Sequence, residues 1–325
     1  MVTTMSRPND PERDRRFDAM PKAARAQDFE EVMRMVKEGD FTPLSLDQTL
    51  AHTLWYGEAS TWPSRKAIAD FLLDHGADPS GQYGSEGYGP IVFGAGECIQ
   101  PEALEWLIAK GVDVRAQPVE TKYGRQCSVS HLLGTYGRGA NERKHRCLDL
   151  LLREHAYVPP EVSAPILAIH HGHADELVEL LDADRSLVSR TFPDMPYGNI
   201  SLLGATLLHC AVEFGENACI DELLKRNANI NARSEIIDGV GGQTPIFHAI
   251  ATNAAANLHT LEFLAQRAGA AIDMSIQATF RLFDKPQPHP ITPMEFAESS
   301  LGTSNPNRHI RGEVELALLR ELASK

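Results

Sequence analysis

TLLHCAVEFGENACIDELLKRNANINA, residues 206–232, is the stretch that decides the fold of this chain. Thr206 precedes a short segment of small and apolar residues, and a Thr or Ser at such a place caps the first turn of a helix. Further on, the residues CIDELL (219–224) carry apolar side chains at helical spacing, which indicates a second, amphipathic helix. The stretch therefore predicts a helix, a turn, a second helix and an exposed hairpin.

The same unit returns along the chain. The ending LLKRNANINA (223–232) has counterparts in LLDHGADPS (72–80), LIAKGVDVRA (107–116) and LLREHAYVP (151–159). A unit of this size cannot bury its apolar faces alone, so the copies must stack on one another. The first helices of the copies are expected to begin at Thr49, Gly89, Ser128, Ser163, Thr206, Thr244 and Thr292.

This pattern resembles the ankyrin repeat family, whose motif runs T-P-L-H, then small residues and Gly, then a helix that ends in G-A-D. The resemblance is strongest at residues 206–232 and at HGAD (75–78), and it extends more weakly over nearly the whole chain. It implies an all-α fold, an ankyrin-repeat solenoid of about eight stacked helix-turn-helix units with short β-hairpin fingers. It also implies one domain over residues 1–325, divided into a flexible start (1–16), an amino-terminal cap (17–43), central repeats (44–274), and a long finger with a carboxy-terminal cap (275–325).

The adjacent His209 and Cys210 raise the question of a nucleophile with its base. The resemblance instead assigns His209, like His52 and His131, to a position whose hydrogen bonds tie hairpins to neighbouring repeats. Cys210 and Cys219 are expected to pack as small helix residues, which is where free cysteines commonly lie. The chemistry suggested by the adjacency is therefore interpreted as a product of the repeat.

Composition narrows the possible partners. Lys and Arg total 31 against 44 Asp and Glu, and the formal charge of −13 opposes binding to a phosphate backbone. Such acidity could steer a basic protein toward the chain, although it more often serves solubility. No apolar run is long enough for a membrane span or a secretory signal. The five cysteines show no CxxC spacing, and the HHGH segment (170–173) has no second cluster to complete a zinc site. We therefore expect a cytoplasmic protein without a cofactor or metal, and with neither nucleic acid nor membrane as partner.

Binding is expected where a copy is longer than the repeat needs, because loops that project from rigid elements carry recognition. Two insertions fall between paired helices, around Trp62 and Arg138, and four others lengthen the fingers at 115–127, 190–204, 232–243 and 273–290. Aromatic residues in these fingers are predicted binding anchors, although each could instead fold back over its own loop. They are Tyr123, Phe192, Tyr197, Phe280 and Phe283.

The resemblance also implies a row of residues on the concave surface. Two interpretations remain open. The row could hold another protein, as in a scaffold, an inhibitor or an immunity protein, and this non-catalytic function is the favoured one. Alternatively, an enzyme or small-molecule receptor could use His170, Glu213 and Tyr136 for acid and base chemistry in the groove. The predicted row consists of Tyr56, Glu97, Tyr136, His170, His171, Glu213, Phe214, Thr252 and Ser299.

Overall fold

The computed structural model describes most of the chain, and its contacts divide the chain into two compact units. Unit 1 contains Met1–Leu132 and Arg146–Tyr157, and unit 2 contains Leu133–His145 and Val158–Lys325. Among the described residues, none of the helices combines the length and the apolarity needed to cross a bilayer. The described residues are 19–39, 41–81, 83, 89–121, 124–134, 141–193, 195, 200–250, 254–281, 287–301 and 306–324, with side chains omitted at 254–258, 299–301 and 306–312.

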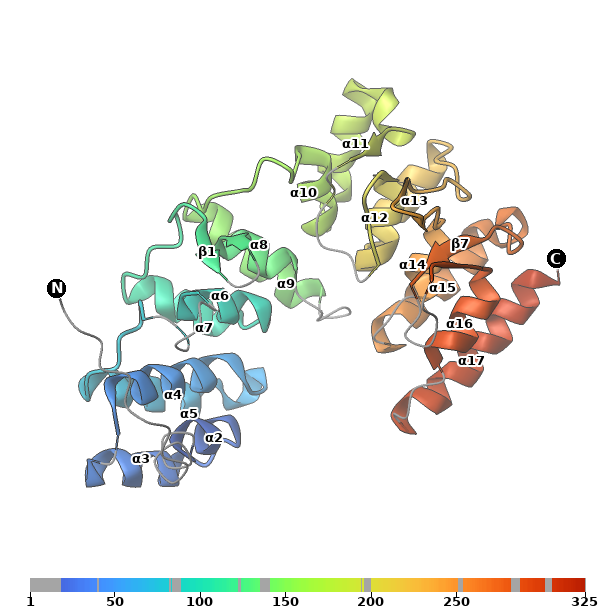
Figure 1. Cartoon of the computed structure of the whole chain (residues 1–325). Helices are drawn as coiled ribbons and strands as arrows, with labels where there is room; N and C mark the ends of the chain where they lie inside the picture. The colour runs from blue at the N-terminus through green and yellow to red at the C-terminus, as the bar shows by residue number, and fades with distance from the viewer. Residues whose placement is uncertain are drawn as a thin grey trace. The chain divides into compact units, whose positions relative to one another are not determined.

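Unit 1 is built from paired helices (Figure 1). Helix α2 contacts α3 and α4, α4 contacts α5 and α6, and α6 contacts α7, so first helices pack on first helices. A short 3-10 turn, Ala59–Thr61, fills the predicted insertion before Trp62. The helices are α2 (Ala19–Arg25), α3 (Phe29–Glu38), α4 (Pro43–Trp55), α5 (Trp62–Asp74), α6 (Ile91–Glu97), α7 (Pro101–Ala109) and α8 (Ser128–Leu133), followed by α9 (Asn141–Arg153), within which the division between the units falls.

Unit 2 repeats the arrangement. The first helices α10, α12, α14 and α16 contact one another in order, and the second helices α11, α13, α15 and α17 do the same. Each pair can thus bury its apolar faces only against the next. The bounds are α10 (Ala164–His170), α11 (Ala174–Ala183), α12 (Leu207–Phe214), α13 (Asn217–Lys225), α14 (Pro245–Ile250), α15 (Ala254–Ala268), α16 (Pro293–Leu301) and α17 (Pro306–Ala323), with 3-10 turns at Arg185–Val188 and Gly269–Ala271.

All four predicted fingers contain short antiparallel strands. The chain pairs β1 (Val119–Thr121) with β2 (Gly124–Gln126), and β3 (Thr191–Phe192) with β4 (Ala205–Thr206). A four-stranded sheet follows in the order β5-β6-β7-β8, from β5 (Ile236–Ile237), β6 (Val240–Gly241), β7 (Ala278–Phe280) and β8 (His289–Ile291). The predicted all-α class of stacked helix pairs with short hairpins is confirmed.

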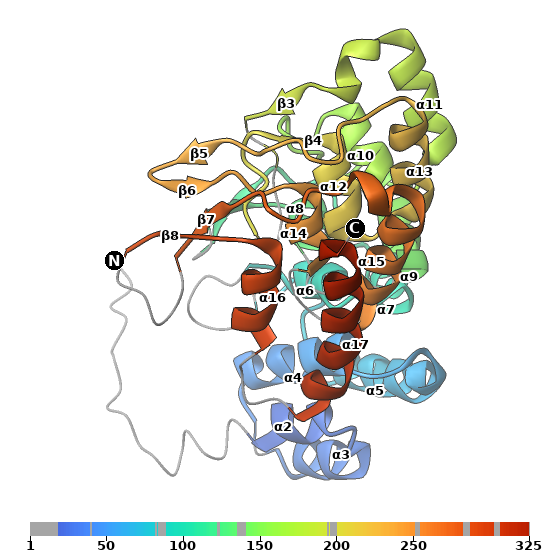
Figure 2. The same cartoon turned by 90° about the vertical axis from the view of Figure 1, so that its right-hand side faces the viewer.

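The β5–β6 hairpin shows why its sequence forms a finger. Ile237 pairs with Val240, and Asp238 and Gly239 between them both have positive φ, of 51° and 76°. Two such residues in succession form the tight turn that matches the twist of paired strands, and Asp-Gly is a preferred pair for it. Figure 2 shows this hairpin extending away from helices α12 and α14.

One predicted helix start is wrong. The helix expected from Thr49 begins at Pro43 instead, with Thr42 as its cap: the N–H of Ser45 donates to Thr42 Oγ1 at 3.1 Å, and the N–H of Thr42 donates to Ser45 Oγ at 2.8 Å. Thr49 lies inside α4, where its hydroxyl donates to the Ser45 carbonyl at 2.6 Å. A threonine can satisfy its hydroxyl within a helix in this way, so TPLS (42–45), with Pro in the first turn, is the stronger start signal.

The prediction that His209 ties neighbouring repeats is confirmed. The N–H of Thr206 donates to His209 Nδ1 at 3.1 Å, and His209 Nε2–H donates to the carbonyl of Gln243 in the next repeat, also at 3.1 Å. Burial, followed by the nearby His248, lowers the pKa of His209 to about 3, so its imidazole is neutral. Burial likewise raises the pKa of the fully buried Cys210 thiol, which removes the reactive thiolate that a nucleophile would need.

Candidate functional site

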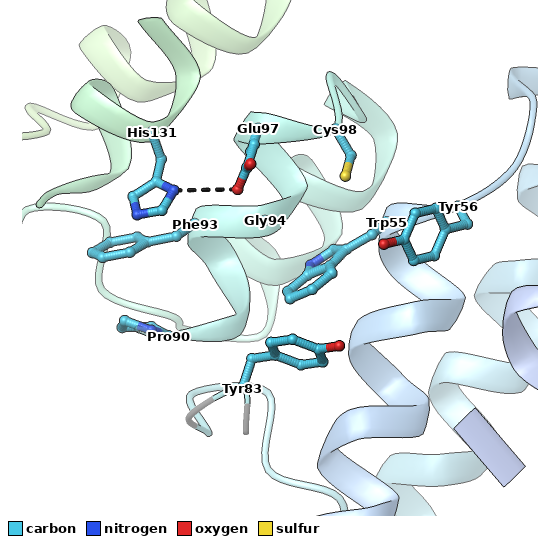
Figure 3. Close-up of a pocket in the computed structure, with 9 residues that line it drawn as sticks. All are labelled: Trp55, Tyr56, Tyr83, Pro90, Phe93, Gly94, Glu97, Cys98 and His131. Atoms are coloured by element: carbon cyan, nitrogen blue, oxygen red, sulfur yellow. Dashed lines mark ion pairs between the residues drawn. The ribbon is translucent and has the colours of Figure 1, made fainter. Parts of the chain in front are cut away.

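A pocket of about 240 Å³ opens in unit 1 (Figure 3). Helices α4 and α6 supply most of its walls, the loop at Tyr83 closes one side, and α8 contributes a histidine. Ligand pockets for drug-sized molecules are usually about 300–1,000 Å³, so this pocket suits one side chain better than a whole cofactor. The described residues that line it are Trp55, Tyr56, Tyr83, Pro90, Phe93, Gly94, Glu97, Cys98 and His131.

Aromatic rings form the walls of this pocket. The buried indole of Trp55 is fixed because its Nε1–H donates to the Ile91 carbonyl at 2.9 Å. The Tyr83 ring lies against it with centroids 4.4 Å apart, and Phe93 stacks on His131 at 4.6 Å. These contacts bring separate stretches of the chain together into one pocket walled by aromatic rings.

Gly94 allows this arrangement. A Cβ built on Gly94 would lie 2.2 Å from Cε2 of Trp55, far inside van der Waals contact. The absence of a side chain in α6 therefore lets the indole lie directly against the helix.

Glu97 supplies the charge at the pocket. Its side chain is 50% exposed, and its Oε2 lies 3.4 Å from Nδ1 of His131. Burial, followed by the charge of Glu97, raises the pKa of the Cys98 thiol to about 12, so that thiol is neutral. Glu97 carries the single carboxylate among the described lining residues, and these residues include neither Lys nor Arg.

An arginine that does not line the pocket already stacks on one of its tyrosines. Arg25 does not line the pocket, but its Cζ lies 4.6 Å from the centroid of the Tyr56 ring. Burial raises the pKa of the Tyr56 hydroxyl above its usual value. The neutral Tyr56 ring therefore offers its face to a guanidinium in the folded chain.

The fingers present a second kind of surface. Ile236 and Ile237 in β5 are 54% and 40% exposed, and Val119 and Leu203 in two other fingers are also exposed. Sequence reasoning identified these fingers but expected aromatic anchors on them. The signal for the aliphatic anchors was present in IIDGV (236–240), where large apolar residues flank a tight turn.

Four described residues of the predicted concave row are not on the surface. His170, His171, Glu213 and Phe214 are buried, and the expectation that they face a partner is wrong in this respect. The Phe214 ring packs against His170 with centroids 4.1 Å apart, and His248 Nδ1 lies 2.7 Å from Glu213 Oε2. The ends of α10 and α12 are covered because neighbouring first helices pack closely along them.

Two residues of the alternative acid–base site are inaccessible for the same reason. His170 and Glu213 are each 0% exposed, and the carboxylate of Glu213 is engaged with His248 of the next repeat. A substrate could reach either group only if the packed helices separated. Tyr136, the third residue of that site, lies outside the described residues.

The remaining predicted residues divide into three groups. Tyr56 and Glu97 lie together at the pocket, as described above. Phe280 is buried against Phe247 of α14 and Phe296 of α16, so it is a packing residue and not an exposed anchor. Phe192 is half-buried in β3. Tyr123, Tyr197, Phe283 and Thr252 lie outside the described residues, as does the side chain of Ser299.

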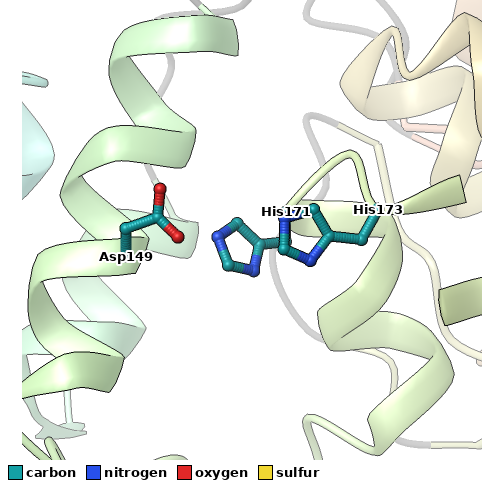
Figure 4. A group of neighbouring side chains, drawn as sticks. All are labelled: Asp149, His171 and His173. Carbon is teal, nitrogen blue, oxygen red and sulfur yellow. The ribbon is translucent and has the colours of Figure 1, made fainter. Parts of the chain in front are cut away.

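His171 is buried at the end of α10 and stacks on the exposed His173. Their ring centroids are 3.7 Å apart, and Figure 4 shows the two imidazoles lying one against the other. This contact covers the His171 ring, so His171 offers little surface to a partner.

Comparison with known proteins identifies the repeat. The family model of the ankyrin repeat matches residues 203–235. One similar solved structure is the human ASB11 ankyrin repeat domain, with 15% identity and a TM-score of 0.39, and the match covers 75% of this chain and 97% of that one. Another is the ankyrin repeat domain of Bcl-3, with 16% identity and a TM-score of 0.31, and the match covers 86% of this chain and 98% of that one. Comparison with curated proteins gave no match. The match shows that residues 203–235 form an ankyrin repeat, and helix pairs and hairpins of the same kind lie on either side of it.

Proposed function

We propose that this chain is a non-catalytic binding protein that holds another protein with its fingers, as a scaffold, an inhibitor or an immunity protein does. Ankyrin repeat domains are generally protein–protein interaction modules, whose rigid stacks present extended binding surfaces. The observation that carries the proposal is the β5–β6 hairpin, which exposes Ile236 and Ile237 at the end of a tight turn. Large apolar side chains on a projecting, hydrogen-bonded loop are suited to enter a partner's pocket.

The net charge of the chain supports a basic partner, and its free cysteines support a reducing compartment. The formal charge of −13 would speed the approach of a basic protein. All five cysteines are free thiols, which is consistent with a reducing cytoplasm. A basic cytoplasmic protein is therefore the partner we propose.

Photo-crosslinking tests this function. A benzoylphenylalanine placed at position 237 should capture one specific protein from extracts of the source cell, identified by mass spectrometry. The same group at Val314, which is 51% exposed on α17 outside the fingers, is the control. Capture of the same proteins from both positions would argue against a recognition role for the finger.

The captured protein then permits a quantitative test. The double variant Ile236→Asp and Ile237→Asp should weaken its binding by about tenfold or more, because burying two anchors contributes well over 1 kcal/mol. Val314→Asp adds a charge to an equally exposed aliphatic site in the same unit and should leave the affinity unchanged. If the double variant also binds normally, the proposed binding surface is wrong.

A further inference from the structure

The aromatic pocket of unit 1 has the chemistry of a site for a cationic side chain. Its walls are the rings of Trp55, Tyr83 and Phe93, whose faces carry partial negative charge. The half-exposed carboxylate of Glu97 stands at the same pocket and adds a full negative charge. A cation placed between rings and a carboxylate gains from both.

Size and hydration favour a guanidinium over an ammonium. The pocket volume of about 240 Å³ is below the usual range for drug-sized ligands, and aromatic rings form much of its walls. Entering such walls removes water from the cation, and a guanidinium is more weakly hydrated than an ammonium. The stacking of Arg25 on Tyr56 shows that a guanidinium packs against one of the lining rings in this structure.

We propose that this pocket binds an arginine side chain of the partner protein, with the guanidinium between the aromatic walls and the carboxylate of Glu97. The proposal rests on the proposed function, because it assigns one contact of the protein partner. Arg25, as a like charge nearby, limits the affinity.

Three capped tripeptides that differ only at the central residue test the proposal: alanine-arginine-alanine, the same peptide with lysine, and the same peptide with the neutral norleucine. The protein carries 5-fluorotryptophan, and the fluorine resonance of Trp55 is assigned by its loss in Trp55→Phe. Trp62 and Trp106 do not line the pocket and serve as internal references. The arginine peptide should shift the Trp55 resonance saturably and leave the other two unchanged.

Charge variants show whether Glu97 is responsible. Glu97→Gln should raise the dissociation constant of the arginine peptide by roughly fivefold, the scale of a half-exposed ion pair. Glu58→Gln makes the same change in net charge at an exposed residue that does not line the pocket and should leave the constant unchanged. Arg25→Ala removes the nearby like charge and should strengthen binding.

Three results would overturn the proposal: no saturable shift at Trp55, equal binding of the norleucine peptide, or binding of the lysine peptide as tight as that of the arginine peptide. The outcome is separable from that of the proposed function, because the peptides report on the pocket without the partner. If the peptides fail while the finger variants still weaken binding of the captured protein, the arginine site is wrong and the proposed function is retained.

Discussion

The fit of Trp55 against a glycine of α6 provides a sharp test of how the repeats of unit 1 pack. Replacing Gly94 by Ala adds one methyl group at a point 2.2 Å from Cε2 and 2.4 Å from Cζ2 of the indole. The ring cannot yield freely, because its Nε1–H is bonded to the Ile91 carbonyl at 2.9 Å and is buried. The added methyl therefore overpacks the contact between the helices and pushes the indole away from its acceptor.

The magnitude follows from these two costs. Overpacking of a filled core costs about 1–3 kcal/mol, and stranding a buried donor costs a further 1–3 kcal/mol. The better helix propensity of Ala returns about 1 kcal/mol. We therefore expect Gly94→Ala to lower the free energy of unfolding by about 1–5 kcal/mol.

Gly96 in the same helix is the matched control. A Cβ there would lie 3.5 Å from Cβ of Leu132, an ordinary contact. Gly96→Ala should therefore stabilise the chain by about 0.5–1 kcal/mol through helix propensity alone. Trp55→Leu removes the clashing ring, so Gly94→Ala should cost much less in that background.

Urea denaturation followed by circular dichroism and tryptophan fluorescence measures all four variants. The fluorescence of Gly94→Ala should also shift to longer wavelength as the indole becomes exposed. If Gly94→Ala proves as stable as Gly96→Ala, the close packing of α4 on α6 is wrong.

Three further predictions concern buried polar groups. Arg65 is fully buried and donates to the Leu54 carbonyl at 3.1 Å, so Arg65→Met should lower the free energy of unfolding in urea by about 3 kcal/mol or more. The same substitution at the exposed Arg34 should lower it by about 0.5 kcal/mol or less, and equal losses would contradict the prediction. The unfolded chain protonates His209 near its ordinary pKa of 6.5, whereas the folded chain resists protonation until about pH 3, so stability should fall by up to about 1.4 kcal/mol per pH unit as the pH drops below 6.5. A stability profile with the same slope in His209→Gln would refute that assignment. Burial alone would raise the pKa of Glu216, but His145 and Lys144 hold it below its usual value. The ion pair of Lys144 and Glu216, whose Nζ and Oε1 are 2.9 Å apart, therefore stabilises the fold at neutral pH. This stabilisation is lost as the pH falls through the folded pKa of Glu216. Glu216→Ala alone should cost about 3–5 kcal/mol at pH 7 by calorimetry, and adding Lys144→Met should restore part of it; a further loss would show that the two groups do not depend on each other.

The sequence predicted the repeat well because its signals are local. Thr206, His209 and the turn that follows are set within a few residues of one another, and each makes the contact that its position implies. The fingers were predictable as excess length, and Asp238–Gly239 marks one of them by turn chemistry alone. The start of α4 was missed because Thr49 carries a cap-forming side chain that the helix satisfies internally.

Exposure was less predictable, because it depends on distant partners. Glu213 is covered by His248, 35 residues further on, and no feature of its own repeat indicates this. The pocket of unit 1 could not be predicted from the sequence for the same reason. Tyr56 and Glu97 were in the predicted row, but Tyr83, Phe93 and His131 join them only through the packing of separate stretches.

The central claim is that neighbouring repeats bury one another's inner faces. Glu213 of α12 and His248 of α14 test it most directly, since their side chains are both 0% exposed and lie 2.7 Å apart across the boundary between two repeats. A double-mutant cycle with Glu213→Gln and His248→Asn should give a coupling free energy of about 1–3 kcal/mol. Additivity within about 0.3 kcal/mol would show that the two residues do not meet, and would contradict the stacked arrangement.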